Sequence, residues 1–330
     1  MSLLSGWIDP KQPLPEDRKR FSNAALKAMI IPLLIEQVLQ MVVGLADTMM
    51  VSYAGEAVVA GVGLDTMIYT IFIYLFTAIS AGGSVVVAQY IGGEDRENGN
   101  QAASQIFFLA GALSLVCMAL MLLFGNALLH RMYPSTEAAT MAACETYMRI
   151  VALSFPANAI YNAGAALYRT MGRTSVTMKV SLGANLINVA GNAFCIYYLH
   201  MGVAGVAVPT LISRIVGAGV IVVLMVDKKN PLRLRPKEMF FGHPNATKHI
   251  LYIGIPSAIE NSIFQLGRII VVSMISTFGT VQITANAVAN NWDGIGCIVG
   301  NAFSFAMITV IGRCVGTGDM EQVRYYTKKL

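Results

Sequence analysis

Eight long apolar runs dominate this sequence and restrict it to folds that place whole helices in a lipid bilayer. A membrane-spanning helix needs about 20 mainly apolar residues. Each run reaches that length before a glycine, a proline or a group of charges ends it. The runs cover residues 24–51, 58–91, 102–126, 140–168, 176–199, 203–226, 249–278 and 282–312. The sequence therefore predicts an all-α protein, a polytopic membrane helical bundle.

The scarcity of charge supports this prediction. Only 12% of the 330 residues are charged and the mean hydropathy is +0.61, whereas soluble proteins carry about 25% charged residues. Neither the four histidines nor the five cysteines show metal-ligand spacing, and no CxxC pair occurs, so we expect no zinc site and no disulfide framework. The cysteines are Cys117, Cys144, Cys195, Cys297 and Cys314.

The basic residues predict the orientation in the membrane. Residues 1–27 and the segments after the even-numbered spans hold 19 Lys and Arg, and the segments after the odd-numbered spans hold one, Arg131. Because basic residues stay on the cytoplasmic side, we predict a plasma (inner) membrane protein with a cytoplasmic N-terminus. The predicted cytoplasmic segments then account for the net charge of +5, and no nucleic-acid partner is expected.

An internal repeat appears when the sequence is compared with itself at an offset of 224. Residues 31–97 align with 255–321 without a gap, and fourteen of the 67 positions are identical. Two of these pairs are Pro32/Pro256 and Gly92/Gly316, which shared apolar composition does not explain. Repeats of this kind are typical of transporter folds.

The repeat defines the expected domains. They are a cytoplasmic segment (1–23), a complete six-helix lobe (24–226), a basic cytoplasmic linker (227–247) and the first two helices of a pseudo-symmetric second lobe (248–330). A second lobe as long as the first implies about 448 residues and twelve spans. We therefore expect a chain truncated after its eighth membrane helix.

Polar residues within the spans mark a candidate site, because a charge at the bilayer centre costs about 2.5–3.5 kcal/mol. Asp47 is interpreted as the only acidic residue deep in a helix of the complete lobe. Asparagines and Thr210 on three further helices are expected to face it in a small polar chamber, although interhelical hydrogen bonding alone also explains them. The residues predicted to line a substrate cavity are Gln40, Asn158, Asn162, Glu36, Glu260 and Arg268.

The charged members of this set leave alternatives open. Glu36 lies near the cytoplasmic end of its span, where solvent or a lysine can neutralise it, and Glu260 has the same position in the repeat. Arg268 either pairs with a carboxylate or lines the central cavity.

The chain resembles the multidrug and toxic compound extrusion (MATE) family. The resemblance rests on six plus six helices, on Pro32 followed by Leu45-Ala-Asp47-Thr-Met-Met, and on the loop Ala88-Gln-Tyr-Ile-Gly-Gly-Glu-Asp95. Gly254-Ile-Pro-Ser-Ala-Ile-Glu-Asn261 and Phe264-Gln-Leu-Gly267 fit its bacterial branch. The family implies a secondary active transporter, a cation-coupled antiporter that exports amphiphilic, mostly cationic small molecules by alternating access of two lobes. It also implies a protein that functions as a monomer.

The resemblance also assigns roles to individual residues. It implies ion coupling at Asp47 with Asn188 and Thr210 as companions, and helix bending at Pro32. Asn192, which shares a helix face with Asn188, completes the predicted ion-coupling set. Several family members have a second Asp where this chain has Asn192, which weakens a tight sodium site. Desolvation of a lone carboxylate favours its protonated form, which favours proton coupling. A sodium ion at Asp47 is the alternative.

Other functions find less support in the sequence. No P-loop, HExxH or GxSxG motif occurs, so neither a primary pump nor an enzyme is expected, and no cofactor besides the coupling ion. A flippase for lipid-linked saccharides or peptidoglycan precursors needs several cationic side chains in its cavity, and only Arg149, Arg214 and Arg268 lie within spans. A membrane-embedded transferase needs a His or Asp cluster at one membrane face, and none is visible.

Overall fold

The computed structural model describes residues 15, 19–134, 136–227, 230–235, 238–239, 244–276, 278 and 280–330. Within these residues all regular structure is helical. Residues 1–14 and 16–18 of the predicted N-terminal segment, and residues 228, 229, 236, 237 and 240–243 of the predicted linker, lie outside the described part. The elements are α2 (Asn23–Ser52), α3 (Glu56–Gly92), α4 (Arg96–Met132), α5 (Ala138–Ala152), α6 (Phe155–Thr170), α7 (Thr174–Ala193), the π-helical turn η2 (Phe194–Tyr198), α8 (Ala204–Val226), α10 (Pro244–Ser276), α11 (Thr280–Gly316) and α12 (Met320–Lys329).

The predicted all-α membrane bundle is confirmed. Six helices of the described part are long and apolar enough to cross a bilayer: α2, α3, α4, α7 with η2, α8 and the segment Trp292–Gly316 of α11. The helices α5 and α6 are bent by 49° relative to each other and would add a seventh span if the two together form one. The predicted span at 249–278 falls on α10, which is not among these six helices.

The bend between α5 and α6 has a local chemical cause. Pro156 lies in the first turn of α6 and has no backbone N–H to donate to the carbonyl of Ala152, so one continuous helix is disfavoured here. The buried Ser154 hydroxyl donates instead to the carbonyl of Val151 at 2.6 Å. The bend turns Ser154 toward α8, where its oxygen accepts a hydrogen bond from Arg214 at 2.7 Å.

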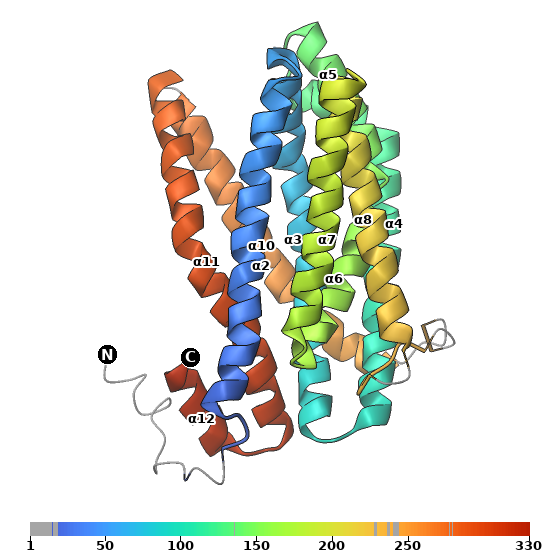
Figure 1. The fold of residues 1–330 in the computed structure, drawn as a ribbon, viewed down its shortest axis with the longest axis vertical. Coiled ribbons are helices and arrows are strands. Elements are labelled where there is room, and N and C mark those ends of the chain that lie inside the picture. Colours follow the sequence, from blue (N-terminus) through green and yellow to red (C-terminus); the bar gives the residue numbers. More distant parts are fainter. Residues whose placement is uncertain are drawn as a thin grey trace.

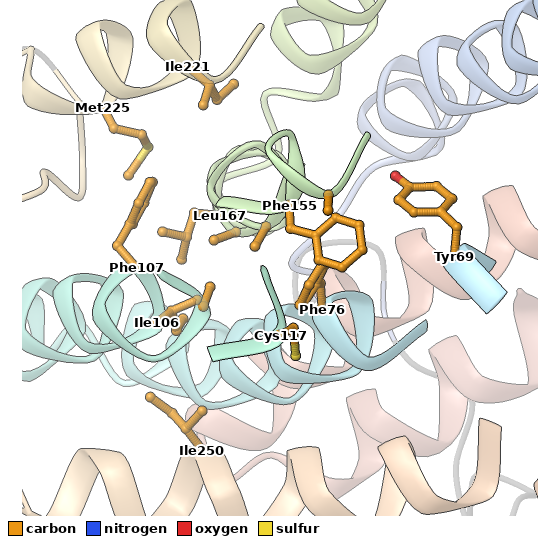
Figure 2. Packing of buried hydrophobic residues seen from close by; sticks show 14 of the residues in the cluster. Tyr69, Phe76, Ile106, Phe107, Cys117, Phe155, Leu167, Ile221, Met225 and Ile250 are labelled. Carbon is orange, nitrogen blue, oxygen red and sulfur yellow. The ribbon is translucent and has the colours of Figure 1, made fainter. Parts of the chain in front are cut away.

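The helices α3, α4, α5, α6 and α8 share one apolar core. Figure 2 shows Phe155 of α6 between Tyr69 and Phe76 of α3, with ring centroids 5.6 and 5.7 Å away. On the other side of α6, Leu167 lies near Ile106 of α4, and both are fully buried. Ala246 and Ile250 of α10 also belong to this core. We call α2 to α8 the first lobe, and α10 to α12 the second-lobe helices.

The second-lobe helices α10 to α12 pack against α2 and α3. We call the end of the bundle where α2 begins and α3 ends the base; it is the lower end in Figure 1, where the C-terminus also lies. Near the base α11 lies beside α2, and it separates from α2 toward the opposite end (Figure 1). The two lobes therefore meet at the base.

The helix boundaries repeat at the offset seen in the sequence. A shift of 224 residues carries the ends of α3 onto the ends of α11, and the last residue of α2 onto the last residue of α10. Asp95 and Asp319 cap the next helices in the same way, each accepting a hydrogen bond from the backbone N–H three residues later, at 3.1 and 3.2 Å. The glycine pair Gly92 and Gly316 lies at the contact between α3 and α11.

The described part of the predicted linker is attached to the base of α4. Arg233 and Arg235 donate backbone N–H groups to Asn100 and Ser104 at 2.9 and 3.2 Å. The Arg235 guanidinium pairs with Glu97 at 2.7 Å, and charge-assisted contacts of this kind raise the pKa of the arginine. The linker thus reinforces the base.

Candidate functional site

A cavity of about 950 Å³ lies between the first lobe and α11, in the half of the bundle away from the base. The C-terminal half of α2, the first turns of α3 and parts of α5, α6, α7 and α8 form its wall, and Asn290 of α11 closes one side. Its apolar lining includes Val43, Val51, Val59, Val62, Met67 and Val206. Its polar lining is Gln40, Asp47, Thr48, Thr66, Tyr147, Asn158, Tyr161, Ser181, Asn185, Asn188, Thr210, Ser213, Arg214 and Asn290. A largely apolar wall with convergent polar groups is typical of small-molecule sites.

The cavity continues toward α11. A second hollow of about 410 Å³ between α2 and α11 shares Gln40, Gly44, Thr48 and Asn290 with the first. Both hollows therefore lie where the two lobes face each other.

Asp47 is the centre of the polar part of the wall. Asn192 Nδ2 donates to Asp47 Oδ1 at 2.9 Å, and Asn192 is fully buried behind it. Thr210 Oγ1 lies 3.0 Å from the amide of Asn188, which itself lies against the Asp47 carboxylate. The structure thus brings together the four residues for which the sequence predicts ion coupling.

The amide of Asn188 connects Asp47 with Thr210. Its Nδ2 donates to the two carboxylate oxygens of Asp47 at 3.0 and 3.2 Å, and its Oδ1 accepts from Thr210 Oγ1 at 3.0 Å. Asp47 Oδ1 thus accepts hydrogen bonds from both Asn192 and Asn188. Two amide donors on one carboxyl group suit its ionised form.

The predicted cavity residues separate into two groups in the structure. Gln40 and Asn158 line the cavity, and Asn158 Nδ2 donates to the Tyr69 hydroxyl at 3.1 Å. Asn162 lies instead in a separate pocket of about 30 Å³ nearer the base, lined also by Ser80 and Thr309.

The charged candidates lie outside the 950 Å³ cavity. Glu260 is exposed on α10. Arg268 is exposed too, and its Nη2 donates at 3.0 Å to Asn290, a residue of the cavity wall. Arg268 therefore does not line the cavity itself, but it contacts the wall residue Asn290.

Glu36 is buried in the base and is fully inaccessible to solvent. Arg169 Nη2 donates to its Oε1 at 2.7 Å and Thr177 Oγ1 donates to its Oε2 at 3.0 Å. The Arg169 guanidinium also lies 4.3 Å from the centre of the Phe305 ring on α11. The neutralising partner is therefore an arginine of α6, not solvent or the lysine that the sequence suggested. Arg169 connects the carboxylate of one lobe with the aromatic ring of the other.

Further contacts close the base between the lobes. Leu26 and Met29 of α2 pack with Val310 and Cys314 of α11 and Tyr326 of α12 in one buried cluster. Pro32 lies inside α2, one residue before Leu33, which packs on Ala302 and Ala306 of α11. The cavity is thus separated from the base by a layer of buried contacts.

Sequence reasoning missed two charged residues of this lobe. Asp65 of α3 is only 2% exposed, so the prediction that Asp47 is the only deep acidic residue of the lobe is wrong. Arg214 of α8 lines the cavity, where sequence reasoning weighed it only as a flippase residue. Both interrupt apolar runs, the signal that drew attention to Asp47. In the described part of the chain no group of three His, Cys, Asp or Glu side chains could hold a metal ion, and all five cysteines are free.

Comparison with known proteins places this arrangement in a family. The profile of the family described as MatE matches residues 32–194 and 256–330. An uncharacterized transporter, YisQ, of Bacillus subtilis is 31% identical over 297 residues, covering 88% of this chain and 64% of the relative. The probable multidrug resistance protein NorM of Thermotoga maritima is 29% identical over 326 residues, covering 98% and 68%. The chain thus spans about two thirds of the length of these relatives.

Solved structures share the fold. A MOP superfamily transporter from Pyrococcus furiosus superposes with a TM-score of 0.86 at 23% identity, covering 92% of this chain and 67% of that one. An outward-facing multidrug resistance MATE family transporter superposes with a TM-score of 0.84 at 22% identity, covering 91% and 66%. The family profile, the relatives and the helical arrangement agree, and the chain belongs to the multidrug and toxic compound extrusion family of membrane transporters, which are not enzymes.

Proposed function

We propose that this protein is part of a cation-coupled antiporter that exports amphiphilic, mostly cationic small molecules. The observation that carries the proposal is the 950 Å³ cavity between the lobes, with Asp47 in its wall and a closed base below it. A transporter that alternates access needs such a site, open toward one side while contacts between the lobes seal the other.

The cavity wall suits a substrate with an apolar body and a positive charge. Valines and Met67 supply apolar surface, and the Asp47 carboxylate supplies negative charge. In the described part of the chain no Lys or Arg forms an ion pair with Asp47, which accepts hydrogen bonds from the neutral amides of Asn192 and Asn188. An ionised Asp47 would therefore attract a cation, either substrate or coupling ion.

The same residues offer a place for the coupling ion. The side-chain oxygens of Asp47, Asn188 and Thr210 lie close together, and the buried Oδ1 of Asn192 accepts no hydrogen bond from the described residues. Oxygen ligands suit a sodium ion, and the Asp47 carboxyl group can also exchange a proton. We propose a proton or a sodium ion as the coupling ion, with no other cofactor.

The proposed orientation follows from the basic residues. We place the base in the cytoplasm of a bacterial-type inner membrane, since the N-terminal segment and the segments after even-numbered spans carry most Lys and Arg. The structure would then have its cavity on the outer side. We further propose that the full-length protein works as a monomer.

Transport by the full-length protein in vesicles tests the proposal. A proton gradient and a sodium gradient are imposed separately, and efflux of a fluorescent amphiphilic cation is followed in each case. We expect efflux driven by one of the two gradients. Efflux that is indifferent to both gradients would overturn the antiport mechanism. The flippase alternative predicts several cationic wall residues, and of Arg149, Arg214 and Arg268 only Arg214 lines the 950 Å³ cavity.

A further inference from the structure

Asp65 carries a buried carboxyl group that has no role in ion coupling at Asp47 as proposed above. It lies on α3, one helical turn after Gly61, and is 2% exposed. Gly61 allows α3 to approach α5 closely, because a Cβ at this position would lie 2.8 Å from the backbone nitrogen of Cys144. The close approach of the two helices encloses Asp65 away from lipid and water.

The carboxyl group of Asp65 lacks the partners that a buried charge requires. Among the described residues no hydrogen bond and no ion pair reaches it, in contrast to Glu36, which has both. An ionised carboxylate without a partner in a low-dielectric interior costs far more free energy than the neutral acid. Burial without a partner therefore favours the neutral, protonated form of Asp65.

One cation lies near both acids, the half-buried Asp47 in the cavity wall and the buried Asp65. The Arg214 guanidinium interacts electrostatically with Asp65 and with Asp47. It is held away from Asp65 by a hydrogen bond to Ser154 Oγ at 2.7 Å and by stacking 4.7 Å from the Tyr69 ring. A single guanidinium can neutralise one carboxylate at a time, so a second ionised carboxylate here would remain uncompensated.

The other titratable groups near Asp65 do not offer a competing cation. They are Tyr69 on its own helix, Cys144 and Tyr147 of α5, and Tyr133 before α5. All four are neutral when protonated. Tyr147 and Arg214 also line the 950 Å³ cavity, so the surroundings of Asp65 extend to the cavity wall. Among the described neighbours of Asp65, Arg214 is therefore the one that carries a positive charge.

We propose that Asp65 is a second proton-carrying carboxyl group of the coupling site and that Arg214 becomes its counter-ion when the proton leaves. The O–H bond of Asp65 breaks and the proton passes to water at the cavity wall. The guanidinium then exchanges the Ser154 oxygen for the new carboxylate, so the buried charges balance. This proposal rests on the proposed antiport function, which it deepens by assigning a second exchangeable proton.

Infrared spectroscopy of the purified full-length protein tests the protonation without any transport. The carbonyl stretch of a protonated carboxylic acid is recorded as a function of pH in the wild type, in Asp65→Asn and in the control Glu56→Gln, which removes an exposed acid from the same helix. We expect the Asp65 substitution to remove an acid band that the control retains. An acid band unchanged by Asp65→Asn would overturn the proposal.

Arg214→Gln provides a second test that keeps Asp65 in place. Without its counter-ion, Asp65 should hold its proton to higher pH, so the acid band should persist over a wider pH range than in the wild type. The same pH dependence in both proteins would overturn the role of Arg214. The control Arg149→Gln removes an exposed arginine, which contacts Glu145 at 3.8 Å, and should leave the band unchanged.

Proton counting in vesicles then tests the coupling role. We expect Asp65→Asn to transport substrate with one proton fewer per molecule than the wild type. An equal number of protons would show that the Asp65 proton does not exchange and would overturn the proposal. If transport is driven by sodium and moves no protons, the antiporter stands and the role of Asp65 falls. If neither gradient drives transport, the proposed function falls, and the infrared band still reports the Asp65 proton.

Discussion

Gly92 and Gly316 are 224 residues apart, yet each lies against the helix backbone that carries the other. A Cβ at Gly92 would collide with the carbonyl oxygen of Arg313, and a Cβ at Gly316 with the carbonyl oxygen of Gln89. Gln89 and Arg313 are themselves repeat mates. The contact at the base is therefore two-fold symmetric, as expected when equivalent helices of two repeats meet.

We predict that Gly92→Ala weakens the closed base. The added methyl group meets backbone, which cannot rotate away, so α3 and α11 must separate at a cost of about 1–3 kcal/mol. Labelling of a cysteine at Thr309, which is 2% exposed, should become faster. The control Gly111→Ala has open space around its Cβ and should not change labelling. Equal labelling in both variants would contradict the symmetric contact as a seal.

Asp47→Asn should abolish gradient-driven efflux by the full-length protein and leave its Tm unchanged. Asparagine keeps the shape of the side chain and its contact with Asn192, but it neither titrates nor carries charge. Efflux is measured in vesicles and Tm in detergent. Near-normal coupled efflux would remove Asp47 from the mechanism, and a large loss of Tm would make it a structural residue.

Asn192→Asp should be tolerated and should increase dependence on sodium. The side chain is fully buried beside Asp47, and a second carboxylate adds an anionic oxygen ligand that a cation can neutralise. The measurement is the rate of efflux against sodium concentration at constant pH. Because aspartate has the shape of asparagine, the substitution changes charge and not packing, and a sodium response equal to that of the wild type would argue against a cation site here.

Glu36→Gln should destabilise the protein by about 3–5 kcal/mol, because it leaves the guanidinium of Arg169 in the base without a counter-charge. The double variant Glu36→Leu with Arg169→Met removes both charges and should recover much of the loss. Comparison of Tm values tests this pair. A double variant as unstable as the single one would mean that packing, not charge, is responsible.

The proposed orientation predicts which loops face the cytoplasm. In a background without cysteines, Asn245→Cys should resist a membrane-impermeant thiol reagent in intact cells, and Glu137→Cys should react. Both positions are exposed in the structure and lie near opposite ends of the bundle. The reverse pattern would invert the topology.

Much of the fold could be predicted because a membrane helix needs a long apolar run, and such runs are visible in the sequence. The ungapped repeat predicted the matching boundaries of α3 and α11, since identical spacing gives identical helix lengths. The bend at Ser154 was not predicted, although Pro156 marks it. The apolar run continues through both residues, and periodicity carries no signal of a change in direction.

The site was only partly predictable, because a sequence shows which residues are polar but not which way they face. Asp47, Asn188, Asn192 and Thr210 converge as expected. The partner of Glu36 is Arg169, 133 residues away, a pairing that depends on how α2 packs on α6. Asp65 could have been noticed by the criterion applied to Asp47, but its enclosure by α5 depends on packing.

The hydrogen bonds that join Asp47 to Thr210 have a consequence for the order of events in transport. Asn188 Nδ2 donates to the Asp47 carboxylate, and Asn188 Oδ1 accepts from Thr210 Oγ1 at 3.0 Å. Protonation of Asp47 would weaken it as an acceptor for this amide. A change of charge on α2 would thereby reach the Thr210 side chain on α8 before any atom of the main chain moves. Chemistry at Asp47 would come first, and the rearrangement of helices would follow it.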